Sequence, residues 1–138
     1  MKIRPYDDAD EPAVIALWKA TLADAAPHND PVTAIRLKRA FERDLFFVAD
    51  VAGQVVGTVM GGYDGHRGWV YSVAVDSENR HRGIGSALVR HLETVLAGKG
   101  CLKVNLQVRA SNAGVIAFYE KLGYAVEERV SMGKRLYS

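Results

Sequence analysis

The stretch WVYSVAVDSENRHRGIGSALVRHLETVL, residues 69–96, places a strand pattern, a polar turn and a helix pattern in direct succession. Residues 69–75 form a short apolar run followed by a polar loop, as in a buried strand. Apolar residues then recur on one helix face. These positions are Ile84, Leu88, Leu92, Val95 and Leu96. A strand that leads through a loop into an amphipathic helix predicts an α/β domain with the helix packed on a sheet.

Two hairpins are predicted before this stretch. The apolar run 45–49 predicts a central strand, and Ala52-Gly53 predicts a tight turn into a strand at residues 54–63. The glycine-containing turn 64–68 then leads into residues 69–75. The three strands therefore form an antiparallel meander.

The remaining elements follow from caps and periodicity. Helices are predicted at residues 7–23, 31–44 and 112–123, and strands at residues 3–6, 102–108, 124–128 and 129–136. The strand at 102–108 is expected to run parallel to 69–75, because a full helix lies between them. We predict an α/β (α+β) fold with a mixed, mostly antiparallel sheet of six to seven strands and about four helices on its faces.

Composition limits the classes of protein. The 138 residues are 49% hydrophobic and 25% charged, which predicts one domain over residues 1–138. The net charge is +2 and no block of basic residues is present, so a nucleic-acid partner is not expected. No signal peptide or 18-residue apolar run is evident, which predicts a cytoplasmic protein without a membrane partner. Cys101 is the single cysteine and reads as a small core residue.

The turn at residues 80–86 has the form of an anion site. The first N–H groups of a helix have no intrahelical acceptor, and the helix dipole is positive there. Gly83 and Gly85 allow a phosphate to approach the backbone, and Arg80 and Arg82 add positive charge. The turn lacks the third glycine of a dinucleotide fingerprint and the Gly-Lys-Ser/Thr ending of a P-loop.

A family resemblance follows from this turn together with the segment after it. Asn112, then Phe118-Tyr119 and then Leu122-Gly123-Tyr124 come after the Arg-x-x-Gly-x-Gly turn. This order resembles the GNAT superfamily of acetyl-coenzyme A-dependent N-acetyltransferases over nearly the whole chain. Within that superfamily, residues 57–68 resemble the bacterial YpeA group.

The resemblance implies roles for particular residues. The pyrophosphate of acetyl-coenzyme A would be held at Arg80, Arg82, Gly83, Ile84, Gly85 and Ser86. The pantetheine arm would be held at Val73, Val75 and Asn112, and Tyr119 would lie near the thioester sulfur. Direct transfer to an amine then needs an oxyanion donor near Val73 and a proton for the thiolate, for which Tyr119 is the candidate.

The general base stays open at this point. Relatives that acetylate protein N-termini can carry a glutamate where this chain has Gln107, and a neutral amide accepts no proton. Candidates by placement are Asp64, His66, Tyr71, Glu78 or water. Asp64 and His66 have no evident third ligand nearby, so no metal is predicted.

The acceptor is expected to be a primary amine of a small metabolite or of a protein, with the metabolite slightly preferred. Its pocket would use the first two helices and the turn after residue 63. Candidate wall residues are Trp18, Asn29, Asp30 and Trp69. The alternative function is a coenzyme A-binding sensor without turnover. Nucleic-acid binding through Arg80, Arg82 and Arg90 is weakly supported, and the resemblance is compatible with a homodimer.

Overall fold

The computed structural model describes residues 1–22 and 26–138 and contains a mixed sheet in the order β1-β2-β3-β4-β5. The predicted antiparallel meander is present, and the fifth strand runs parallel to the fourth as predicted. The strands are β1 (Lys2–Pro5), β2 (Phe46–Val51), β3 (Gln54–Tyr63), β4 (Gly68–Val75) and β5 (Val104–Leu106). The predicted α/β class is therefore confirmed.

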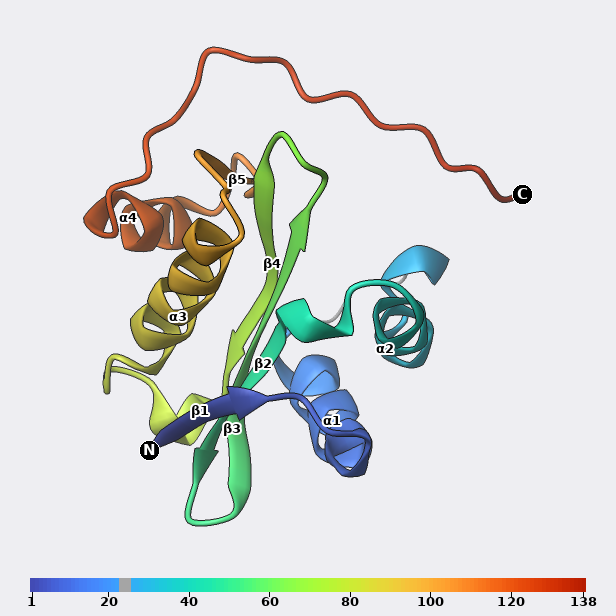
Figure 1. Cartoon of the computed structure of the whole chain (residues 1–138), viewed down its shortest axis with the longest axis vertical. Helices are drawn as coiled ribbons and strands as arrows, with labels where there is room; N and C mark the ends of the chain where they lie inside the picture. The colour runs from blue at the N-terminus through green and yellow to red at the C-terminus, as the bar shows by residue number, and fades with distance from the viewer. Residues whose placement is uncertain (23–25) are drawn as a thin grey trace. The chain divides into compact units, whose positions relative to one another are not determined.

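Helices cover both faces of this sheet (Figure 1). On one face α1 (Glu11–Thr21) and α2 (Pro31–Ala40) share a core with β2 and β3. That core includes Val14, Trp18, Ile35, Phe46, Val48 and Met60. On the opposite face α3 (Ile84–Gly98) packs on β2, β3 and β4, and its His91 ring lies 4.5 Å from the Phe47 ring. Successive residues of β2 thus contribute to the two faces in turn.

Glycines allow α3 to lie close to the sheet. A Cβ atom at Gly61 would lie 2.4 Å from Cδ1 of Leu92, and one at Gly68 would lie 2.8 Å from Sγ of Cys101. A larger residue at either position would force the Leu92 side chain, or those of Cys101 and Leu96, to shift. Leu88, Leu92 and Leu96 are fully buried, so the predicted helix face is confirmed.

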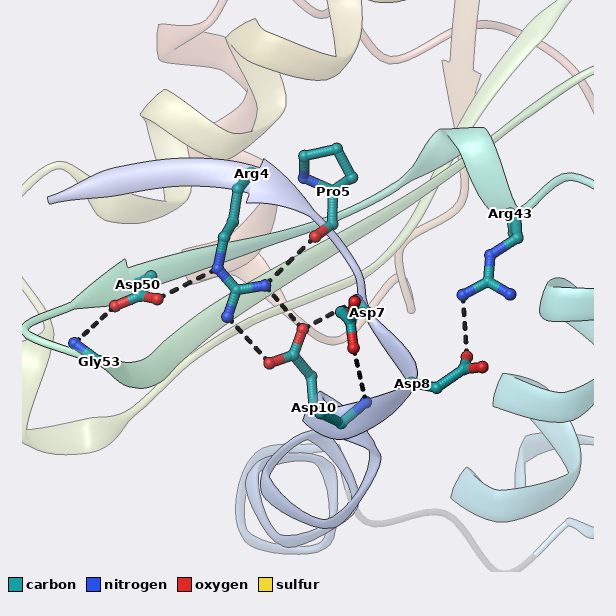
Figure 2. A network of polar contacts seen from close by, with 9 residues as sticks. Arg4, Pro5, Asp7, Asp8, Asp10, Arg43, Asp50 and Gly53 are labelled. Carbon is teal, nitrogen blue, oxygen red and sulfur yellow. Dashed lines mark hydrogen bonds and ion pairs between the residues drawn. The ribbon is translucent and has the colours of Figure 1, made fainter.

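An ionic network joins β1 to its neighbours (Figure 2). Arg4 donates two hydrogen bonds to Asp10, at 2.8 and 2.9 Å, and one to Asp50 at 3.1 Å. The other carboxylate oxygen of Asp50 accepts from the N–H of Gly53 at 2.8 Å, in the turn between β2 and β3. One guanidinium therefore links the first strand, the start of α1 and the first hairpin.

The residues divide into two compact units, Met1–Gln107 and Val108–Ser138. The second unit contains α4 (Ala113–Lys121), whose first turn is capped by Asn112 through a 3.2 Å hydrogen bond from the N–H of Val115. Gly123, with φ of 96°, follows the helix as predicted. No strand is present among residues 124–138, so the strands predicted at 124–128 and 129–136 are wrong.

Several predicted boundaries also differ. The helix predicted from residue 31 to Asp44 ends at Ala40 and is followed by a 3-10 turn, η3 (Arg43–Leu45). The predicted strand 102–108 is reduced to Val104–Leu106. The predicted end of the first helix at Ala23 lies outside the described residues. The sheet has five strands in the described part of the chain, rather than six to seven.

Candidate functional site

The start of α3 presents unpaired backbone N–H groups. Gly83 is the N-cap residue, with φ of 74°, and no side chain caps this end of the helix. The first helical hydrogen bond runs from the N–H of Ala87 to the carbonyl of Gly83 at 3.0 Å. Across the described residues, nothing accepts a hydrogen bond from the N–H of Ile84, Gly85 or Ser86. These groups and the positive end of the helix dipole favour an anion.

Open space and positive charge surround these N–H groups. A Cβ atom at Gly83 would meet no atom within 4 Å. Arg80 and Arg82 are exposed beside it, and Arg82 donates a 3.4 Å hydrogen bond to Asn79 at the end of η4 (Ser77–Asn79). His81 also has a positive φ, 63°, in the turn just before the helix. The turn therefore has the geometry and charge of a phosphate site.

The edge of β4 is open beyond its first residues. β4 pairs with β5 only from Gly68 to Val70, and no other described strand continues that pairing from Tyr71 to Val75. Val73 and Val75, the predicted contacts of the pantetheine arm, lie on this open segment. A strand edge without a neighbour offers backbone donors and acceptors to an extended ligand.

A bulge distorts β4 at the same place. Thr58 pairs with Ala74 and Met60 pairs with Tyr71, so Ser72 and Val73 together face one residue of β3. Ser72 has a φ of 53°, which is unusual for a residue other than glycine.

Buried side chains support this bulge. The Thr58 hydroxyl donates to the Ser72 carbonyl at 3.0 Å and accepts from the Trp18 indole N–H at 2.8 Å. Trp18, predicted as a wall of the acceptor pocket, is instead a buried support of the bulge. Of the other predicted wall residues, Asp30 caps α2 by accepting from the N–H of Thr33, and Trp69 lies in β4 opposite Asn105 of β5.

A polar cluster that sequence reasoning missed lies beside the bulge. The Lys38 ammonium is buried at 6% exposure and donates to the Gly61 carbonyl and to the Tyr71 hydroxyl, the latter at 3.0 Å. Glu42, one turn further along, lies 3.7 Å from the same nitrogen. Burial lowers the pKa of Lys38, and the negative charge of Glu42 partly offsets this. The lysine occupies an ordinary polar position in the helix pattern, so only its burial distinguishes it.

Of the four residues considered as the general base, Tyr71 alone belongs to this cluster. Asp64 accepts from the N–H groups of His66 and Arg67, at 2.8 and 2.7 Å, which stabilises a turn and lowers the pKa of its carboxyl. His66 and Glu78 are exposed. Among the residues that the structure describes, no three His, Cys, Asp or Glu side chains gather as metal ligands.

Tyr119 and Asn112 lie in the second unit. Tyr119 is 8% exposed, and burial raises its pKa to about 12. The Phe118 and Tyr124 rings meet it edge to face, at centroid distances of 5.0 and 5.6 Å. Asn112 is exposed, and its side-chain oxygen caps α4.

Comparison with known proteins identifies the family. Residues 14–124 match the acetyltransferase (GNAT) family, and the chain therefore belongs to it. The predicted superfamily is thereby confirmed, while the assignment to the YpeA group stays a prediction. No helix of the described residues is long and apolar enough to cross a membrane.

Individual relatives agree with this assignment. An acetyltransferase of Sodalis glossinidius (strain morsitans) is 47% identical over 137 residues, covering 99% of this chain and 96% of that protein. The crystal structure of Ard1 from Thermoplasma volcanium matches with a TM-score of 0.81 at 29% identity, covering 91% of this chain and 83% of that one. The PaiA N-acetyltransferase from Thermoplasma acidophilum, in complex with coenzyme A, has the same fold, with a TM-score of 0.73, 23% identity and coverages of 94% and 92%.

Proposed function

We propose that this protein is an acetyl-coenzyme A-dependent N-acetyltransferase that moves the acetyl group directly to a primary amine. The observation that carries the proposal is the set of unpaired N–H groups at Ile84, Gly85 and Ser86, flanked by Arg80 and Arg82. A diphosphate is the part of the coenzyme that such a cradle fits. Family membership supports the same ligand.

The open edge of β4 is the proposed binding site of the pantetheine arm. Backbone groups of Val73 and Val75 would hydrogen-bond the amides of that arm, as a neighbouring strand would. Asn112 is the second proposed contact. The arm would bring the thioester towards the bulge at Ser72 and Val73, where an N–H can stabilise the oxyanion that forms on attack.

Tyr119 is the proposed proton donor to the departing thiolate. Its burial keeps the phenol protonated at neutral pH, which is the form that a general acid requires. Transfer without a covalent enzyme intermediate needs no nucleophilic Cys or Ser in the chain. When bound, acetyl-coenzyme A supplies the activated acyl group.

The acceptor is proposed to be an amine of a small metabolite or of a protein, the metabolite being slightly preferred. We also propose that residues 1–138 act as one catalytic domain, since the family match crosses the boundary between the two compact units. A cytoplasmic location and a homodimer are compatible with this function and stay predictions.

Replacing Gly83 tests the cradle. We expect Gly83→Glu to abolish detectable binding of acetyl-coenzyme A in calorimetric titration, because a carboxylate would occupy the anion site. Unfolding should stay cooperative, since the added side chain enters open space.

Gly53→Glu is the matched control for this experiment. Gly53 also has a positive φ, 83°, and open space at its Cβ position, but it lies in the turn between β2 and β3. The control carries the same backbone strain and charge and should bind normally. Unchanged affinity in Gly83→Glu would show that the phosphates bind elsewhere.

A thiol-release screen with metabolite amines and peptides tests turnover separately. Release with at least one amine is expected. Tight coenzyme binding without release from any amine in a broad panel would instead favour a sensor, for which the neutral Gln107 is the supporting observation.

A further inference from the structure

Lys38 has an environment unlike that of the other lysines whose contacts are described. Lys99, for comparison, forms an exposed 2.7 Å ion pair with Asp44. The nitrogen of Lys38 is buried between α2, β3 and β4, and its shortest contacts are to neutral oxygens, the Gly61 carbonyl and the Tyr71 hydroxyl. Burying an ammonium in this way is costly, whereas a neutral amine is tolerated far better.

Tyr71 connects this buried amine to the open edge of β4. It is the first residue beyond the segment paired with β5, and it precedes the bulge at Ser72 and Val73. Its side chain is 42% exposed, while its hydroxyl oxygen lies 3.0 Å from the Lys38 nitrogen and 3.2 Å from the Gly61 oxygen. Rotation about the C–O bond therefore lets the hydroxyl proton point to either partner.

The proposed reaction needs a proton acceptor at this place. A primary amine with a pKa near ~10 reaches the protein mainly as an ammonium ion, and only the neutral amine attacks a thioester. Gln107 accepts no proton, and the Asp64 carboxylate already accepts hydrogen bonds from the N–H groups of His66 and Arg67 in its own turn. The Glu42 carboxylate is engaged by Lys38 and by the N–H of Tyr63, at 3.7 and 3.1 Å.

We propose that Tyr71 and Lys38 form a proton relay that deprotonates the acceptor amine, Tyr71 contacting the amine and Lys38 receiving the proton. This inference rests on the proposed function and deepens it by naming the general base. Tyr71 is then a catalytic residue, and Glu42 is a positioning residue that stabilises the ammonium formed on Lys38.

The proton count of the relay is balanced. The acceptor ammonium gives one proton to the Tyr71 oxygen as the Tyr71 hydroxyl proton moves to neutral Lys38. The freed nitrogen lone pair forms the new C–N bond to the acetyl carbon, and the C–S bond breaks as the tetrahedral intermediate collapses. The thiolate takes a proton from Tyr119, and the second amine proton passes through water to the Tyr119 phenolate, which restores the phenol. Lys38 returns its proton to water through the partly exposed Tyr71 hydroxyl.

Charges around the relay set its pH dependence. Lys38 faces Glu42, which precedes η3, Asp44 in η3 and the neutral groups of Gly61 and Tyr71. Burial has the largest effect and lowers the pKa of Lys38. Burial and Glu42 raise the pKa of Tyr71, so this phenol relays a proton without becoming a stable phenolate. The relay works at pH values above the pKa of Lys38 and fails as acid charges the lysine.

The test compares pH–rate profiles of Tyr71→Phe and Lys38→Met with the unchanged protein. Each variant keeps most of the side-chain volume and removes one relay group. For an amine with a pKa near ~10, we expect kcat/KM to fall about 1000-fold at pH 7, within the usual range for general base catalysis. The deficit should shrink about tenfold per pH unit towards the pKa of the amine, because the variants depend on amine already neutral in water.

A structural role would give a different profile. If Lys38 and Tyr71 only stabilise the fold, the variant profiles run parallel to that of the unchanged protein, and this result overturns the relay. Lys99→Met removes an exposed lysine with a carboxylate partner and should leave the profile unchanged. If Lys38→Met does not fold, the pH–rate profile of Tyr71→Phe alone decides the question, because this variant keeps the aromatic ring and removes only the hydroxyl.

The same measurements separate this inference from the proposed function. Acetyl-coenzyme A should bind both variants as tightly as it binds the unchanged protein, because neither residue belongs to the cradle. If the unchanged protein is active and the variant pH–rate profiles run parallel to its own, only the relay is rejected. An unchanged protein that binds coenzyme but releases no thiol with any amine rejects both.

Discussion

At the scale of single residues, Tyr119 combines a buried ring with a hydroxyl that is proposed to act as the general acid. Its pKa of about 12 means that the phenol stays protonated throughout the pH range in which the protein would work. Transfer of this proton to a thiolate, whose conjugate acid has a pKa near ~8.5, is uphill, so the proposed role as general acid requires the thiolate to form directly against the hydroxyl. Burial therefore selects the acid form of this residue and disfavours a role as base.

We expect Tyr119→Phe to lower kcat at least about 100-fold and to leave the dissociation constant of acetyl-coenzyme A nearly unchanged. Steady-state thiol release and calorimetry measure the two quantities. Tyr137→Phe, which removes the hydroxyl of an exposed tyrosine, should have no effect on either. If kcat of Tyr119→Phe equals that of the unchanged protein, Tyr119 serves only the core.

At the scale of elements, the Arg4 network makes the attachment of β1 and α1 sensitive to acid. The hydrogen bonds from Arg4 hold the pKa of Asp10 below its ordinary 3.8. The stabilisation is complete above the unfolded-state pKa and is lost as pH falls through the lower folded-state value. This network therefore contributes at neutral pH and fails below about pH 4.

We expect Asp10→Asn to lower the free energy of unfolding by about 2 kcal/mol at pH 7, because it leaves Arg4 without its bidentate partner. The difference from the unchanged protein should disappear near pH 2 in urea unfolding curves. Asp30→Asn is the control, since asparagine is an equally good helix cap. A loss for Asp10→Asn that persists undiminished at pH 2 would argue against the ion pair as its cause.

Local sequence patterns predicted most helices and strands because particular residues mark where these elements begin and end. The glycine turn, the Asn112 cap and the Ala52-Gly53 hairpin each need a particular residue, and all three were found where predicted. The bulge at Ser72 and the burial of Lys38 were missed, since both depend on partners distant in sequence. The two strands predicted after residue 123 are absent because a strand forms only where it pairs with the edge of another strand. Val130 and Met132 in that segment are 89% and 91% exposed, so their side chains are not packed on a sheet.

At the scale of the whole molecule, charge is nearly balanced, with a net charge of only +2. Long-range attraction of an anionic coenzyme is therefore weak, and under the proposed function most of the attraction comes from the local charge at Arg80 and Arg82. Both side chains are exposed, so salt should screen their attraction strongly.

We expect the dissociation constant of acetyl-coenzyme A to rise with salt, and Arg80→Gln or Arg82→Gln to weaken binding about 3- to 10-fold at low salt while flattening that dependence. Arg36→Gln removes an equally charged, 70% exposed side chain on α2 and should change neither quantity. Binding that is indifferent to salt in the unchanged protein would mean that the arginines do not face the phosphates.

The close packing of α3 against Gly61 and Gly68 has a mechanical consequence. Leucines of the helix occupy the space that side chains would fill at these glycines, and this interlocking packing resists sliding of the helix along β3 and β4. The anion cradle at its start and the free edge of β4 therefore keep a fixed spacing. Under the proposed function, that spacing would set the length of thioester arm that the protein accepts, and an acyl donor with a shorter or longer arm would hold its carbonyl away from the bulge even with its phosphates fully bound.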